Sequence, residues 1–184
     1  MPWWAWILIA IGVVILIALA GWVVQTRRRT RHLRERFGPE YRRVAGMSES
    51  KREAEAALAE REARREQLQI RDLPETSRAR YVEAWKTVQA EFVDEPRRAV
   101  ASADALLQQV MAERGYPVED FEQRAADLST DHPEVVQNYR AGHRLVLESK
   151  DGDGSSTEDL RQAMHHYRAL FEELVERAPK ERAA

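Results

Sequence analysis

Residues 81–92, YVEAWKTVQAEF, decide the fold class of this chain. The large apolar side chains of Tyr81, Trp85, Val88 and Phe92 recur at spacings of four, three and four, which places them on one face of an α-helix. No segment of the sequence alternates apolar and polar residues as a half-buried strand does. The pattern therefore predicts an all-α protein.

Downstream of this stretch, the same periodicity continues to the end of the chain. It predicts an antiparallel helical bundle over residues 73–178, with four main helices and a short one over residues 118–128. The predicted helix ends are Pro96 near a first turn, Gly115 as a C-terminal cap, Asp131 with Pro133 at a helix start, and Ser156 with Asp159 as a capping box. We expect residues 179–184 to form a disordered tail.

Upstream of the bundle, the sequence becomes highly charged. Residues 47–72 are rich in Ala, Glu and Arg and poor in large apolar side chains, which is typical of a solvated helix. We therefore expect a charged stalk helix, with Ser48 as its N-cap. Residues 26–46 are expected to form a basic juxtamembrane helix that is interrupted at Gly38-Pro39.

The chain opens with an apolar run, WWAWILIAIGVVILIALAGWVV, over residues 3–24. A helix of this length spans about 33 Å, enough to cross the hydrocarbon core of a bilayer. We expect residues 1–25 to form a transmembrane anchor in the inner (plasma) membrane of the cell, with the N-terminus outside and the bundle in the cytoplasm. The residues expected at the membrane interface are Trp3, Trp4, Trp6, Trp22, Arg27, Arg28, Arg29 and Arg31, the arginines lying beside anionic headgroups.

A cleaved signal peptide is the alternative interpretation of this run. Ala18-Leu19-Ala20 before Gly21 resembles a small-residue cleavage site, and cleavage there would release a secreted helical domain. The first residues, MPWW, carry no basic side chain, and the apolar run continues past the site into arginines. Both features favour the anchor.

Charge is distributed unevenly along the chain. Residues 1–43 carry a formal charge of +6 and the remainder −8. A basic collar beside an apolar run, followed by an acidic domain, favours contact with lipid headgroups, and we expect no nucleic-acid binding. The chain has no cysteine, which excludes disulfides and Cys-based metal sites.

Two segments of the bundle resemble a known group of proteins. Residues 114–145, RGYPVEDFEQRAADLSTDHPEVVQNYRAGHRL, and residues 156–175, STEDLRQAMHHYRALFEELV, are similar to uncharacterised bacterial membrane or secreted proteins. These proteins have an N-terminal apolar segment and a helical C-terminal half. The resemblance covers most of the chain after residue 70 and implies no activity.

No motif in the sequence predicts catalysis or a cofactor. The acidic segment that contains Glu119, Asp120, Asp131 and His132 is a possible surface for a protein partner, although helix capping is the favoured explanation for acids at these positions. Asp151-Gly152-Asp153-Gly154 fits no EF-hand register and is predicted to be a turn.

The histidines give the second functional hypothesis, a metal- or small-ligand-binding bundle that uses His143, His165 or His166. The leading hypothesis is a membrane-anchored helical interaction or adaptor protein that is not an enzyme. Its protein partner and its oligomeric state do not follow from the sequence.

Overall fold

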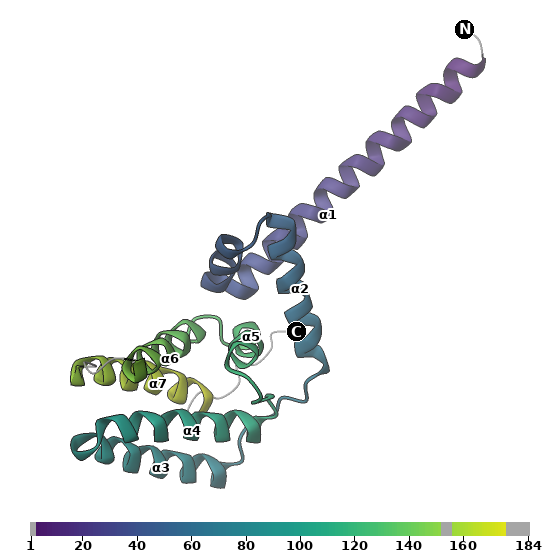
Figure 1. Cartoon of the computed structure of the whole chain (residues 1–184). Coiled ribbons are helices and arrows are strands. Elements are labelled where there is room, and N and C mark those ends of the chain that lie inside the picture. The colour runs from purple at the N-terminus through teal and green to yellow at the C-terminus, as the bar shows by residue number, and fades with distance from the viewer. Residues whose placement is uncertain (1–2, 152–155, 176–184) are drawn as a thin grey trace. The chain divides into compact units, whose positions relative to one another are not determined.

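A computed structural model describes the backbone of residues 3–151 and 156–175, and the side chains of residues 12, 14–148 and 156–175. This part of the chain contains helices and no strand, which confirms the all-α fold (Figure 1). The helices are α1 (Trp3–Met47), α2 (Lys51–Gln67), α3 (Glu75–Asp94), α4 (Pro96–Arg114), α5 (Phe121–Asp131), α6 (Val136–Asp151) and α7 (Thr157–Val175). The predicted tail, residues 179–184, and most of the predicted turn at Asp151-Gly152-Asp153-Gly154 lie outside the described residues.

The chain divides into two compact units, Met1–Leu58 and Ala59–Ala184. In the first unit, α1 bends sharply at Gly38, whose φ of 44° and ψ of −118° are not helical. Glycine adopts this positive φ without a Cβ penalty, and Pro39 then begins the second helical piece. The predicted interruption at Gly38-Pro39 is thus confirmed. The bend allows the unit to bury Leu33, Phe37, Tyr41, Val44, Ala54 and Leu58 together.

The N-terminal part of α1 presents exposed apolar side chains. Ile17 is 67% exposed and Trp22 is 68% exposed, and residues 14–29 are exposed without exception. In the part of the chain with described side chains, no helix is both long enough and apolar enough to cross a membrane. The transmembrane helix over residues 1–25 stays a prediction, and the side chains of Trp3, Trp4 and Trp6 lie outside the described residues.

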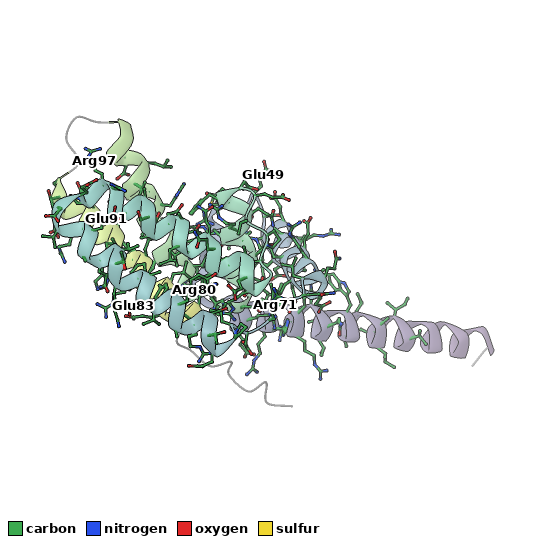
Figure 2. The ribbon with its side chains drawn as sticks, turned by 90° about the horizontal axis from the view of Figure 1, so that it is seen from below. Glu49, Arg71, Arg80, Glu83, Glu91 and Arg97 are labelled. Atoms are coloured by element: carbon green, nitrogen blue, oxygen red, sulfur yellow. The ribbon has the colours of Figure 1, made fainter. Side chains whose placement is uncertain are left out.

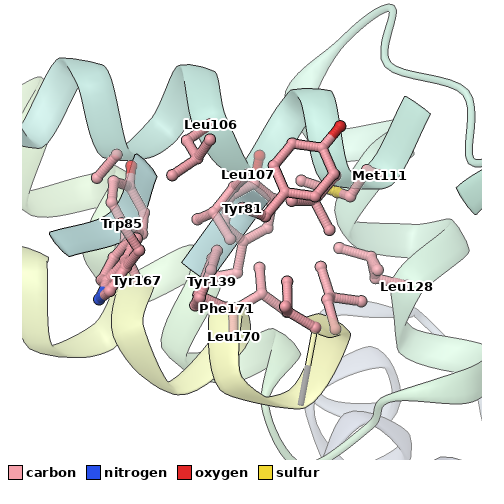
Figure 3. Packing of buried hydrophobic residues seen from close by; sticks show 14 of the residues in the cluster. Tyr81, Trp85, Leu106, Leu107, Met111, Leu128, Tyr139, Tyr167, Leu170 and Phe171 are labelled. Atoms are coloured by element: carbon pink, nitrogen blue, oxygen red, sulfur yellow. The ribbon is translucent and has the colours of Figure 1, made fainter. Parts of the chain in front are cut away.

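The second unit is a helical bundle built from two hairpins and α5. The α3–α4 hairpin and the α6–α7 hairpin pack together mainly through α4 and α7 (Figure 1). The predicted apolar stripe of α3 turns into the core, where the rings of Trp85 and Phe171 stack with centroids 4.6 Å apart. Tyr139, Tyr167 and Leu128 lie in the same cluster (Figure 3). Charged side chains such as Arg80, Glu83, Glu91 and Arg97 lie on the outer surface of α3 and α4 (Figure 2).

Several helix ends follow the sequence, and others differ from it. Gly115 is the left-handed C-cap of α4, and Ser156 and Asp159 exchange the hydrogen bonds of a capping box. The short helix begins at Phe121 and not at residue 118, because the Asp120 carboxylate accepts from the Gln123 N–H and fixes the start there. Asp131 ends this helix and does not cap the next one, which begins at Val136.

Residues 47–72 contain the predicted charged helix, but this helix is not solvated on every side. The helix is α2, and Ser50, not Ser48, lies before its first turn and accepts from the Glu53 N–H. Ala54 and Leu58 are buried in the first unit. In the second unit, arginines on the C-terminal half of α2 pair with acidic side chains of α5. The polar composition of α2 therefore reflects ion pairing as well as solvation.

Candidate functional site

A basic pocket lies on α1, just after the apolar run. Its volume is about 460 Å³, and it is lined by Thr26, Arg27, Thr30, Arg31, Arg34, Glu35 and Lys51. Four of these side chains are cationic and one is anionic, so the lining carries a formal charge of +3. All seven residues belong to the first unit. A pocket of this size and charge suits a small anion with several oxygen atoms.

Helical spacing brings the α1 residues of the pocket together. Arg27 and Arg31 are four residues apart, and Arg34 follows after three more, so all three lie on one face of the helix. Thr26 and Thr30 line the pocket from the neighbouring side of α1. Thr26 Oγ1 donates to the Trp22 carbonyl at 2.8 Å, and Thr30 Oγ1 donates to Glu55 Oε1 at 2.8 Å. Because both hydroxyl hydrogens are used within the protein, the cations are the donors that remain for a ligand.

The bend at Gly38 brings Lys51 to this stripe. Lys51 is the first residue of α2, and its Nζ lies 3.5 Å from Glu55 Oε1. Glu55 is buried and also accepts from Tyr41 Oη at 3.1 Å. Burial alone would raise the pKa of Glu55, but the hydrogen bonds from Thr30 and Tyr41 and the charge of Lys51 outweigh it and lower the pKa. Glu55 is therefore a buried carboxylate that ties α1 to α2 behind the pocket.

The cationic side chains of the pocket differ in the hydrogen bonds, ion pairs and ring contacts that they make within the protein. Arg31 Nε donates to Glu35 Oε1 at 2.7 Å in an exposed pair. The Arg34 guanidinium lies over the Tyr41 ring, 5.2 Å from its centroid. Arg27 has no hydrogen bond or ion pair with any described residue. The guanidinium groups thus keep N–H donors for an anion, as does the Lys51 ammonium.

Of the residues predicted at the membrane interface, Arg27 and Arg31 line the pocket, whereas Arg28 and Arg29 are exposed outside it. Sequence reasoning treated these arginines as one diffuse collar and missed the pocket. The spacing of Arg27, Arg31 and Arg34 could have revealed the stripe. The contribution of Lys51 could not be foreseen, because it depends on how the chain continues after Gly38.

The predicted acidic surface does not form one cluster. Glu119 and Asp120 are exposed before α5, whereas Asp131 and His132 are half-buried in a polar network. The Asp131 carboxylate accepts from Tyr116 Oη at 2.9 Å and pairs with Arg65 of α2. Burial, together with Asp131, raises the pKa of Tyr116, so its hydroxyl remains a donor. Asp131 therefore holds α2 and the segment before α5 together.

His132 is engaged on the other side of this network. Its Nδ1 lies 3.0 Å from Glu173 Oε1, and because a carboxylate accepts, Nδ1 carries the hydrogen. Burial lowers the pKa of His132, and the positive charge of Arg114 lowers it further. These two effects outweigh Glu173 and Asp131, which raise the pKa. His132 thus acts in the structure as a neutral donor to α7.

A second pair between α2 and α5 was also missed by sequence reasoning. The fully buried Asp127 Oδ1 accepts from Arg64 Nε and from Gln123 Nε2, each at 3.0 Å. Arg61 adds a bond from Nη1 to Ser129 Oγ at 3.3 Å. The available signal was the spacing of Arg61, Arg64 and Arg65, which places them on one side of α2. The acidic partners of Arg64 and Arg65 lie more than 60 residues away.

The histidines considered for metal binding have other contacts. His143 stacks on Phe121 with ring centroids 3.6 Å apart, and His166 Nδ1 lies 3.1 Å from Asn138 Oδ1. His165 is exposed, and its ring meets that of His166 edge-on at 6.4 Å. Among the described residues, no three His, Cys, Asp or Glu side chains are grouped as a metal site would require.

Comparisons with protein-family models, with curated proteins and with solved structures find no match for this chain. The resemblance of residues 114–145 and 156–175 to the bacterial membrane or secreted group therefore stays a prediction.

Proposed function

We propose that the chain is a single-pass membrane protein whose helical bundle faces the cytoplasm and binds another protein, without catalytic activity of its own. The observation that supports the anchor is the exposure of the apolar side chains on α1. Val14, Leu16 and Ile17 are each more than 60% exposed, and the run that contains them has no charged residue from Trp3 to Val24. Exposed apolar surface of this extent marks a partner or a membrane, and the length of the run fits a bilayer.

The arginines that follow the run support the proposed orientation. Arg27, Arg28, Arg29 and Arg31 come within seven residues of Val24, and basic residues close to a membrane span favour the cytoplasmic side. We propose that this membrane is a bacterial inner membrane, in line with the predicted resemblance to bacterial membrane or secreted proteins. Trp22 lies at the end of the run, where an indole favours the interface between hydrocarbon and headgroups.

A binding role for the bundle is supported by what its surface offers. Its aromatic side chains mostly pack in its own core, and its exterior carries charged side chains of both signs (Figures 2 and 3). Glu119 and Asp120 extend from the loop before α5, although the Asp120 carboxylate is also used as a helix cap. An exposed acidic loop held by a buried network is a surface that a basic partner could recognise.

Alkaline extraction of membranes tests the anchor. We expect the full chain to stay in the membrane pellet, and the double variant Val14→Arg with Ile17→Arg to be released, because each arginine near the centre of a span costs about 2.5–3.5 kcal/mol on insertion. Val14→Leu with Ile17→Leu is the matched control and should stay in the pellet. Release of the wild-type chain at full length would contradict the anchor, and a soluble product that begins at Gly21 would favour the secreted alternative.

Site-specific photocrosslinking tests the binding role. A photoreactive residue at the exposed Glu122 should give one discrete crosslinked product in cells, and Glu119→Lys should abolish it if the acidic loop is the contact. The same photoreactive residue at the exposed Gln162 on α7 is the control position. Absence of any discrete product from both positions would count against a protein partner for the bundle.

A further inference from the structure

The basic pocket on α1 is more than the diffuse collar that the arginines of the sequence suggest. We propose that it binds one anionic phospholipid by the phosphate of its headgroup. This inference rests on the proposed anchor and deepens it, because it assigns a stoichiometric lipid site to Arg27, Arg31, Arg34 and Lys51. The ligand chemistry is a phosphate oxyanion, which a lipid or soluble phosphate could supply.

The position of the pocket along α1 favours a lipid as the source. The apolar run ends at Val24, and Thr26 to Thr30 lie about 3–9 Å further along the helix axis. The headgroup layer on each side of a bilayer is about 5–8 Å thick. The end of the pocket lined by Thr26 and Arg27 therefore lies at the depth of lipid phosphates when the run spans the hydrocarbon core. Arg31 and Arg34 follow about 10 Å and 15 Å beyond Val24, and side chains on a helix tilt toward its N-terminus, here toward the membrane.

The chemistry of the lining suits a phosphate. Three guanidinium groups and one ammonium are among the groups that line a volume of about 460 Å³, and with Glu35 the lining carries a formal charge of +3. Guanidinium groups form paired hydrogen bonds to phosphate oxygens, and an ammonium adds a flexible point charge. The hydroxyls of Thr26 and Thr30 donate within the protein, so recognition depends on the cations.

Contacts of the buried Glu55 and of Tyr41 fix the positions of the helices that carry the cationic side chains of the pocket. Glu55 is buried and accepts from Thr30 of α1 and Tyr41 beyond the bend, and it lies 3.5 Å from the Lys51 ammonium. Tyr41 also supports the Arg34 guanidinium on its ring. The cations thus come from two helices whose mutual position is set by buried contacts, which a flexible basic segment would lack.

Two double variants distinguish a specific lipid site from diffuse attraction by the whole basic segment. Arg27→Gln with Arg31→Gln removes two charges that line the pocket, and Arg28→Gln with Arg29→Gln removes two charges from the same turns outside it. Net charge and distance from the apolar run are nearly the same in both. Diffuse attraction would weaken equally in the two variants, whereas a built site would weaken only in the first.

The measurement is native mass spectrometry of the full chain in neutral detergent micelles, titrated with dioctanoyl phosphatidylglycerol. We expect one lipid bound per chain, and an affinity at least about tenfold lower in the pocket variant than in the collar variant, because hydrogen bonds to charged groups are lost. Dioctanoyl phosphatidylcholine, whose headgroup is neutral overall, should bind at least about tenfold more weakly than phosphatidylglycerol to the wild-type chain.

Three outcomes would overturn the proposal. Equal losses of lipid affinity in the two double variants would mean that binding is diffuse electrostatic attraction and not a site. Equal affinity of the wild-type chain for the two lipids would mean that the pocket does not select an anionic headgroup. Competition by inorganic phosphate at the same affinity as the lipid would make soluble phosphate the ligand. Because binding is measured in micelles, these failures differ from failure of the anchor, which appears as release of the wild-type chain during alkaline extraction.

Discussion

Gly142 lies at a tight contact between α6 and α7. A Cβ atom built on it would lie 2.7 Å from a ring carbon of Tyr167 and 3.3 Å from the Ala163 carbonyl oxygen. Tyr167 is fully buried and cannot easily move aside. We expect Gly142→Ala to lower the free energy of unfolding by about 1–2 kcal/mol, because overpacking outweighs the gain in helix propensity.

Thermal denaturation followed by circular dichroism measures this effect, and Gly46→Ala is the control. Gly46 is also helical, but a Cβ there would meet nothing within 4 Å, so the control should be neutral or stabilising. Equal stability of the two variants would contradict the packing described for α6 and α7.

His132 should make the stability of the chain depend on pH. Its pKa is lowered from the ordinary 6.5 in the folded protein, so between the folded and unfolded values the unfolded chain binds more protons. The free energy of unfolding should therefore fall as pH decreases below about 6.5, until the folded pKa is reached. His132→Gln should weaken this dependence without abolishing it, since burial also lowers the pKa of His166.

Denaturant melts at pH 7.5 and pH 5.5 measure the dependence on His132. An amide at this position can still donate to Glu173, which keeps the comparison close to the wild-type contact. The same loss of stability at pH 5.5 in the wild-type chain and in His132→Gln would show that His132 is not the responsible group.

At the scale of elements, the ion pairs between α2 and α5 should matter more than the exposed pairs within one helix. Arg65 and Asp131 are 13% and 18% exposed, and removal of the arginine would leave Asp131 partly buried with Tyr116 as a donor. We expect Arg65→Met to lower the free energy of unfolding by about 3 kcal/mol. Arg168→Met, which removes an exposed pair with Glu172, should cost less than about 1 kcal/mol in the same urea melts. Equal effects would mean that α2 does not pack as described.

The bend in α1 should depend on Gly38. Because its φ of 44° is strained for any residue with a Cβ, Gly38→Ala should cost about 1–2 kcal/mol and disturb the position of α2 against α1. Spin labels at the exposed positions of Arg28 and Arg52 report this, since the chain has no native cysteine. We expect one narrow distance distribution in the wild-type background and a broader one with Gly38→Ala. Gly46→Ala should leave it unchanged, and a narrow distribution in both would contradict the role of the bend.

The features that could be predicted from the sequence are those that depend on residues close together in the chain. The stripe of Tyr81, Trp85 and Val88, the cap at Gly115 and the capping box at Ser156 each depend on residues a few positions apart, and the structure agrees with all three. The position of α2 was not predictable in this way. Its few apolar side chains suggest solvent on every side, whereas Arg64 and Arg65 find their acidic partners more than 60 residues away.

At the scale of the whole molecule, the pocket is only partly predictable from the sequence, because some of its residues are neighbours on one helix and others are brought to it by the fold. The spacing of Arg27, Arg31 and Arg34 is visible in the sequence, but a basic stripe alone does not distinguish a pocket from a collar. Lys51 and the buried Glu55 complete the site after the chain has turned at Gly38. The proposed membrane anchor, by contrast, depends only on the exposed apolar run and the arginines that follow it.

The most direct test of the central proposal, a membrane-anchored bundle facing the cytoplasm, uses the absence of cysteine from the chain. Ala101→Cys introduces one thiol at an exposed position of α4. Intact cells are then treated with a membrane-impermeant maleimide before and after lysis. The proposal predicts a full-length chain in the membrane fraction that is labelled after lysis and protected before it. Labelling in intact cells, or a shortened soluble product, would contradict it.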